Sequence, residues 1–311
     1  IWACGLLFVF GSCAEDMVKP IENDKDAPGT VQDVKTESLP GAVKFTYTLP
    51  SDPDLLYVLA KYTNKTGKVM EFRSSFYTNS VTVEGFGDTD TYKVELYTVD
   101  RSENRSQPQI VEVVPLTPPI LSCYESLSMV SDFGGMTFEM DNKFKSDLAI
   151  YVCTPDELGD MVLAETFYSA REEIVYSVRG YDAVPRRFGI FLQDKYGNET
   201  DTLFTELTPI YERELDKTKF REMYLQNDSR VDSYDGKMEY VWNGRISKDG
   251  DSGGVGLHTG TGTKDGPAVF TFDLGVLAKL SRFALWAIQD EKHFYNDMSP
   301  RRYEVWGCAT E

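Results

Sequence analysis

A glycine-rich loop at residues 243–267 holds the residue types most able to do chemistry. Residues 250–254 read GDSGG, a sequence that can present Ser252 as a nucleophile. Such a serine needs a general base within hydrogen-bond reach and a third group that orients the base. No histidine precedes Ser252, and His258 follows it inside the same loop. The spacing therefore argues against a serine hydrolase, and we expect the chain to have no enzymatic activity.

The same loop carries oxygen ligands of the kind that calcium prefers. Asn243 opens the loop, and Asp249 and Asp251 lie within it beside glycines. Calcium takes oxygen ligands from flexible loops, so these three residues could hold one structural ion. A solvated acidic turn would show the same pattern, and this alternative stays open. No zinc site is expected, because the chain has only two histidines and few cysteines.

Aromatic and polar side chains around the loop could recognise a sugar. Trp242 abuts the loop, and His258 and Thr259 lie in it. A second polar loop at 289–300 adds three further candidates: His293, Tyr295 and Asn296. A sugar ring offers an apolar face for stacking and hydroxyl groups for hydrogen bonds, which this mixture of side chains matches.

Short apolar runs flank these loops and predict strands. The runs are MEYVWNG at 238–244, AVFTFDLG at 268–275, KLSRFALWAI at 279–288 and RRYEVWG at 301–307. Such runs, bounded by Gly, Asn and Asp, are typical of β-structure. Trp286 and Trp306 lie inside two of the runs, so we expect both side chains in a hydrophobic core.

An internal repeat organises the middle of the chain. Short runs within residues 43–106 recur within 136–200, with offsets that are all about 94 positions. Each copy consists of short apolar or alternating runs split by turn residues, which predicts an all-β sandwich. A D-x-x-x-N-x-[ST] motif begins at Asp100 and again at Asp194, and we predict a hairpin turn at each. Proline clusters follow both copies and predict domain joints.

These segments carry resemblances to known domain families. Residues 28–118 and 119–213 each resemble a fibronectin type III or immunoglobulin-like module. The sequence FTFDLG, followed by LSRFALW and RRYEVWG, resembles the discoidin (coagulation-factor type C, galactose-binding-like) jelly-roll family. That resemblance implies a carbohydrate-binding-type domain at 214–311. The family's domain is longer than this segment, so the jelly roll is expected to be incomplete here.

The N-terminus has the features of an export signal. LLFVFGSC at 6–13 is an apolar run too short to span a bilayer, and it ends in small residues and Cys13. It resembles a bacterial lipobox, which implies a clipped lipoprotein signal at 1–12 and a lipid on Cys13 that anchors the protein. An ordinary signal peptide with an incidental cysteine is the alternative. The acidic, proline-bearing segment 13–27 reads as a flexible tether.

The net charge limits which partners the chain is expected to bind. The net charge of −18 and the lack of a basic cluster exclude nucleic acid as an expected partner, because a phosphate backbone is bound by clustered Lys and Arg.

Cys123 and Cys153 could form a disulfide in an exported protein. The favoured interpretation is that Cys153, within LAIYVC, is a small buried hydrophobe.

The order of all these parts is similar to that of Bacteroidetes surface lipoproteins linked to polysaccharide uptake. The resemblance implies a non-catalytic, carbohydrate-binding lipoprotein at the outer membrane or cell surface. A glycan would be its ligand, outer-membrane transport components could be its partners, and only the lipid would touch the membrane. Two alternatives remain: a structural or adhesive protein that binds an outer-membrane partner, and the non-catalytic part of a longer enzyme.

Overall fold

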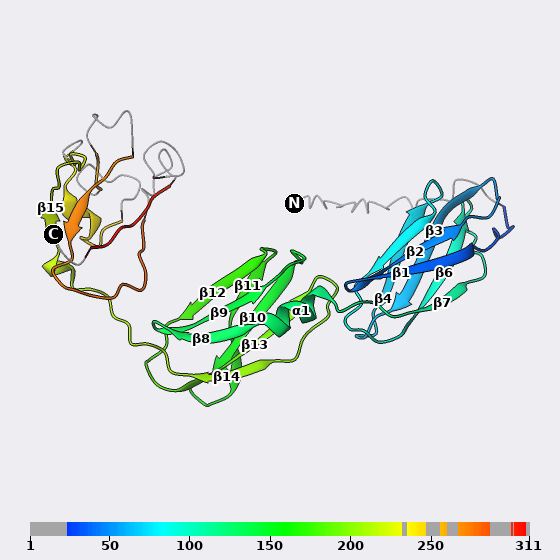
Figure 1. Ribbon diagram of the computed structural model, residues 1–311, viewed down its shortest axis with the longest axis horizontal. Coiled ribbons are helices and arrows are strands. Elements are labelled where there is room, and N and C mark those ends of the chain that lie inside the picture. Colours follow the sequence, from blue (N-terminus) through cyan, green and yellow to red (C-terminus); the bar gives the residue numbers. More distant parts are fainter. Residues whose placement is uncertain are drawn as a thin grey trace, which may run out of the picture. The chain divides into compact units, whose positions relative to one another are not determined.

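The computed structural model describes residues 24–231, 235–246, 256–259, 267–286, 300 and 302–308 (Figure 1). The chain divides into two compact units, Ile1–Ile210 and Tyr211–Glu311. The first unit contains two antiparallel β-sandwiches and one short helix. Strands dominate both sandwiches, so the predicted all-β class and the predicted tandem sandwiches are confirmed.

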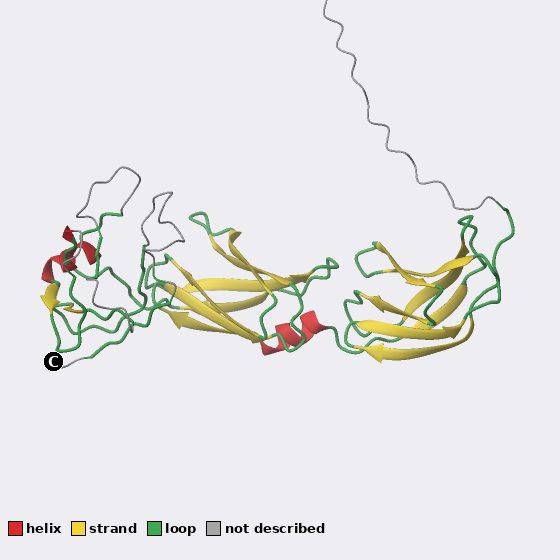
Figure 2. Ribbon diagram, turned by 90° about the horizontal axis from the view of Figure 1, so that it is seen from above, coloured by secondary structure: helices red, strands yellow, loops and turns green. Residues whose placement is uncertain are grey.

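The first sandwich packs a three-stranded sheet against a four-stranded sheet, and the strands within each sheet pair antiparallel (Figure 2). The three-stranded sheet has the order β1 (Gln32–Leu39), β2 (Ala42–Thr48) and β5 (Ser80–Glu84). The four-stranded sheet has the order β4 (Val69–Ser75), β3 (Leu55–Thr63), β6 (Tyr92–Asp100) and β7 (Gln109–Val113). Val43, Phe45 and Tyr47 alternate with more exposed residues along β2 and point into the core, as the period of two in a strand requires.

The second sandwich repeats this arrangement. Its three-stranded sheet has the order β12 (Glu173–Arg179), β9 (Gly135–Asp141) and β8 (Ser128–Asp132). Its four-stranded sheet has the order β11 (Met161–Ser169), β10 (Leu148–Pro155), β13 (Arg186–Asp194) and β14 (Leu203–Leu207). Helix α1 (Pro119–Ser126) precedes β8, and its Ile120 joins the core. Pro119 opens the helix, a position that needs no backbone donor.

The two copies of the repeated motif form the same turn, which confirms the predicted hairpins. In the first sandwich, the Asp100 carboxylate accepts hydrogen bonds from the backbone and side-chain amides of Asn104, at 2.8 and 3.0 Å. In the second, Asp194 accepts the corresponding bonds from Asn198, at 2.9 and 2.8 Å. The Asp and Asn side chains thus satisfy turn amides that no strand partner reaches.

Neither cysteine of the sandwiches forms a disulfide. Cys123 is buried, at 1% exposure, and its thiol donates to Asn142 Oδ1 at 3.6 Å. Burial raises the pKa of the Cys123 thiol to about 11. Cys153 is also unbridged, but it is half-buried rather than fully buried as the sequence predicted. It points to the outer face of β10, because its neighbours Val152 and Thr154 face inward.

The second unit contains little regular structure in its described residues. A 3₁₀ helix at Lys217–Lys219 precedes β15 (Arg221–Met223), which pairs with β16 (Thr271–Asp273). The predicted strand at 238–244 is wrong: Met238–Val241 forms a 3₁₀ helix, in which the Trp242 amide donates to the Glu239 carbonyl at 3.2 Å. Of the three predicted strands after the loop, only β16 is found within the described residues. One two-stranded ladder does not make a jelly roll, so the discoidin-like fold stays a prediction.

Trp286 and Trp306 do not lie in a core, contrary to the sequence prediction. Their side chains are 59% and 86% exposed. Neither residue lies in a strand of the described part of the chain. The Trp306 indole nitrogen donates to Glu304 Oε2 at 3.2 Å, which satisfies its polar atom at the surface.

An ion pair on the outer face of the second sandwich gives a testable pH dependence. The Asp132 carboxylate accepts from Arg179 at 2.9 Å, from Thr137 at 2.8 Å and from Ser177 at 3.2 Å. Burial alone would raise the pKa of Asp132. The hydrogen bonds, beginning with that from the Phe133 amide, and the Arg179 charge outweigh burial and hold the pKa below its ordinary 3.8.

Because the folded pKa of Asp132 is depressed, the unfolded chain binds more protons in acid, and this stabilisation is lost as pH falls through the folded pKa. We expect Asp132→Asn to lower the free energy of unfolding by about 1–2 kcal/mol at pH 7 and to flatten the loss between pH 5 and pH 3. Urea unfolding at these pH values measures both effects. Glu157→Gln, on an exposed turn, is the control. Equal acid sensitivity of Asp132→Asn and the parent protein would contradict the assignment.

Candidate functional site

The structure describes four of the residues that the sequence singled out for binding. They are Trp242, Asn243, His258 and Thr259. The other predicted site residues lie outside the described part of the chain: Cys13, Asp249, Asp251, His293, Tyr295 and Asn296. Their roles in lipidation, calcium binding and ligand binding therefore stay predictions.

Trp242 stands on an aromatic cluster of the second unit. Its ring centroid lies 5.2 Å from that of Phe272 on β16 and 5.7 Å from that of Phe220, just before β15. The Phe220 and Phe272 rings are 5.8 Å apart, so the three rings contact one another. The pairing of β15 with β16 brings the two phenylalanines together from positions far apart in the sequence. Trp242 keeps part of its surface open, because it is only half-buried.

An open hollow of about 460 Å³ lies beside Trp242. The residues that line it are Lys217, Thr218, Glu239, Tyr240, Trp242, Asn243 and Gly244. The hollow thus combines an indole and a phenol with an amide, a hydroxyl, a carboxylate and an ammonium group. Such a mixture suits an uncharged ligand with one apolar face and many hydroxyls.

Local turns fix the polar groups of this hollow. The side-chain oxygen of Asn243 accepts from the Arg245 backbone amide at 2.8 Å, which holds the asparagine in a turn. The Asp216 carboxylate accepts from the Thr218 amide at 3.1 Å and its hydroxyl at 2.6 Å, and this caps the 3₁₀ helix that carries Lys217. Lys217 also pairs with Glu214 at 2.5 Å.

His258 and Thr259 do not line the Trp242 hollow, although both are partly buried. The structure therefore brings together only Trp242 and Asn243 of the four described candidates. Lys217 and Glu239 were missed by sequence reasoning. Glu239 lies within the run MEYVWNG, where a strand would place it on the face opposite Tyr240; the 3₁₀ helix instead lets both residues border one hollow.

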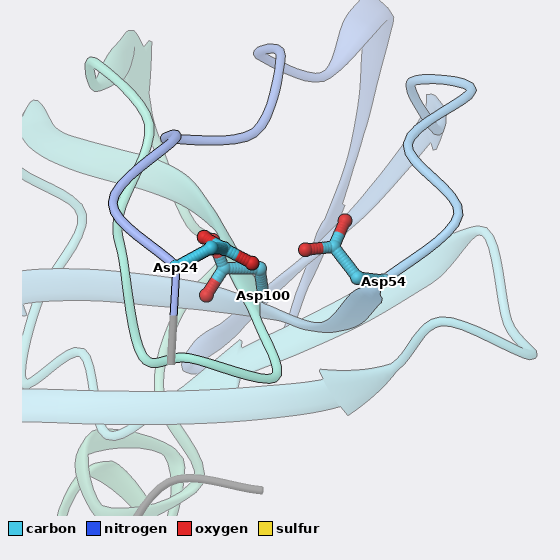
Figure 3. Close-up of side chains that lie close together, drawn as sticks. All are labelled: Asp24, Asp54 and Asp100. Carbon is cyan, nitrogen blue, oxygen red and sulfur yellow. The ribbon is translucent and has the colours of Figure 1, made fainter. Parts of the chain in front are cut away.

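Three carboxylates gather at one end of the first sandwich (Figure 3). Asp24 precedes β1, Asp54 precedes β3 and Asp100 ends β6, and ligand oxygens of all three lie within 4.8 Å of one another. Sequence reasoning identified Asp100 only as a turn residue. Both oxygens of the buried Asp100 already accept hydrogen bonds, from Ser102 and from Asn104, so its main role is to shape the turn.

No described helix has the length and apolar character that crossing a membrane requires.

Comparison with known proteins gives three family matches, each to part of the chain. Residues 28–115 match a family described as a domain of unknown function (DUF4959), and residues 116–218 match another (DUF5126). Residues 242–311 match a third, also described as a domain of unknown function (DUF5000). No curated protein matches the sequence.

A search of solved structures finds matches to parts of the chain. The chain is similar to the SusE-like protein BT2857, with 30% identity and a TM-score of 0.33 over 52% of this chain and 57% of that one. The match thus spans little more than half the length of that protein. A two-domain fibronectin type III segment of chicken tenascin matches 58% of this chain and 99% of its own length, at 12% identity and a TM-score of 0.28. The first three fibronectin domains of chicken CNTN1 match 58% of this chain and 67% of their own, at 10% identity and a TM-score of 0.26.

Proposed function

We propose that this chain is a non-catalytic, carbohydrate-binding protein held at a cell surface by a lipid on Cys13, and that it is an accessory to polysaccharide capture and uptake. The half-buried Trp242 at the edge of a polar hollow carries the proposal. The chain would recognise a glycan through this hollow and leave its bonds intact.

The chemistry of the hollow supports a sugar over other small ligands. The indole face of Trp242 can stack on the C–H face of a sugar ring, and Phe272 and Phe220 hold that face in place. Glu239 accepts hydrogen bonds and Lys217 donates them, so hydroxyl groups find both kinds of partner. Because these two side chains carry opposite charges, the hollow favours a neutral ligand over an anion or a cation.

Trp242→Ala tests this proposal. We expect native affinity gels that contain galactan, arabinan, xyloglucan or galactomannan to retard the parent protein, and the variant to bind the retarding polysaccharide about tenfold more weakly. Trp306→Ala is the matched control, since that indole is exposed and does not line the hollow. We expect it to migrate like the parent. Equal retardation of parent and Trp242→Ala in every gel would contradict the proposal.

A further inference from the structure

A second hollow, of about 780 Å³, opens within the first unit. The second sandwich supplies most of its lining, from the first residues of β10, the last residues of β11 and the Asp194–Asn198 turn. The first sandwich supplies Thr66 and Lys68, from the connection between β3 and β4. We call this hollow the tyrosine groove, because Tyr151, Tyr168 and Tyr196 all line it.

The wall of the tyrosine groove is fixed by contacts between the two sandwiches. The side-chain amide of Asn198 donates to the Gly85 carbonyl at 3.1 Å, and the Tyr196 hydroxyl donates to the Glu84 carboxylate. Gly85 has φ of +85°, and a Cβ there would lie 2.8 Å from Tyr196 Cγ. Only glycine accepts both this conformation and this close approach. The Tyr196 ring therefore contacts the first sandwich directly.

The floor of the groove carries an anchored aromatic ring. Tyr151 lies between the buried Ile150 and Val152 on β10, so its side chain points to the outer face. Its ring stacks on Phe191 of β13, with centroids 4.7 Å apart and an angle of 10° between the planes. The Tyr151 hydroxyl donates to Gln193 at 3.2 Å. The ring is therefore held in place by Phe191 and Gln193 before any ligand arrives.

Tyr168 offers a second aromatic face beside it. This residue of β11 is 75% exposed and pairs in register with Ala149 of β10. Because Ala149 has only a methyl group, no bulky neighbour covers the tyrosine from that strand. Exposing an aromatic ring to water costs free energy that a stacked ligand would recover.

Charges around the groove balance. Lys68 and Lys195 bring two positive charges, and Asp147 and Asp194 bring two negative ones. This balance disfavours a strongly anionic or cationic ligand, and the mixed donors and acceptors suit hydroxyl groups. We propose that the tyrosine groove binds a neutral oligosaccharide chain, which stacks on Tyr168 and Tyr151 and hydrogen-bonds to the polar rim. The proposal does not depend on the Trp242 hollow, because no residue is shared.

The test uses the full chain and isothermal titration with cellohexaose, xylohexaose, mannohexaose and maltohexaose as probes. In a Trp242→Ala background, we expect at least one hexasaccharide to bind, and Tyr168→Ala to weaken that binding about tenfold. Tyr168→Phe keeps the ring and should bind as before. Tyr77→Ala, an 84% exposed tyrosine elsewhere, is the matched control and should also leave binding unchanged.

Hydrogen exchange locates the bound probe. We expect the hexasaccharide to protect the peptides that contain Tyr168 and residues 193–197. The inference is overturned if no hexasaccharide binds in the Trp242→Ala background, or if Tyr168→Ala and Tyr77→Ala bind equally well. If Trp242→Ala alone abolishes all binding, this inference is overturned and the proposed function is supported. The failure of one can therefore be distinguished from the failure of the other. Tyr168 is too exposed for its loss to unfold the sandwich, and circular dichroism verifies this.

Discussion

Replacing Gly135 with alanine is expected to destabilise the second sandwich by about 3 kcal/mol. A Cβ at this position would lie 1.8 Å from the carbonyl oxygen of Val178 and 2.8 Å from its carbonyl carbon. Both atoms belong to the backbone of β12, which pairs with β9 at this point. Neither strand can move away without a cost in free energy, because the Tyr181 amide is hydrogen-bonded to the Gly134 carbonyl at 2.9 Å. Relief of the clash must therefore break part of the sheet.

The first sandwich supplies a matched control for this substitution. Ala42 starts β2 and pairs with Leu39, as Gly135 starts β9 and pairs with Asp132. The first sandwich thus carries a methyl group at the corresponding position. Ala42→Gly should cost only about 0.5–1 kcal/mol, the backbone entropy of glycine. Calorimetry on the full chain separates the two cases, and a Gly135→Ala protein as stable as Ala42→Gly would contradict the expected clash.

Asn198→Ala is expected to loosen the junction between the sandwiches and to lower the stability of the second one by about 2 kcal/mol. The asparagine is buried, at 5% exposure, and its amide donates to both the Gly85 carbonyl and the Asp194 carboxylate. Alanine would leave both acceptors short of a donor. We expect faster hydrogen exchange at residues 84–87 in the first sandwich as well as in the turn itself.

Asn104→Ala separates the two effects. Asn104 makes the same bond to Asp100 in the first sandwich, but its other contacts go to the segment that precedes β1, at Asp24 and Asp26. Asn104→Ala should lower the stability of its own turn by a similar amount, without changing hydrogen exchange at residues 84–87. If Asn104→Ala and Asn198→Ala change exchange there equally, Asn198 does not hold the junction.

The sandwiches could be predicted from sequence because their signals are local and repeated. Alternation such as Val43, Phe45 and Tyr47 identifies an inward face without knowledge of the partner strand. The Asp100 and Asp194 turns depend on bonds within five residues, so the motif alone predicts them. In the second unit, apolar runs bounded by Gly, Asn and Asp predict strands without identifying their partners. A run becomes a strand only beside a partner, and β16 has β15 while the segment around Trp306 has none among the described residues.

The proposed binding residues could likewise be predicted where the signal is local, and were missed where it depends on strand pairing. Trp242 was found from sequence because a tryptophan beside a glycine-rich loop is conspicuous. Its supports, Phe220 and Phe272, were missed because only the β15–β16 pairing brings them together. Tyr151 and Tyr168 were missed because each sits in an apolar strand and reads as core. Their outward positions follow from the buried Ile150 and the partly buried Phe167, which pack on the core side, and this requires the strand register.

The repeated turns also have a mechanical consequence. Asn104 hydrogen-bonds the turn of the first sandwich to Asp24, and Asn198 hydrogen-bonds that of the second to Gly85. Each turn is thus joined to a preceding part of the chain, and we call these two contacts latches. In the proposed surface setting, a pull between the anchored N-terminus and a bound polysaccharide would load these two latches in series. A latch of a few hydrogen bonds opens at lower force than a sheet whose strands must slide past one another. Opening these contacts would therefore let the segment before β1 peel away and the two sandwiches reorient, with both sandwiches still folded.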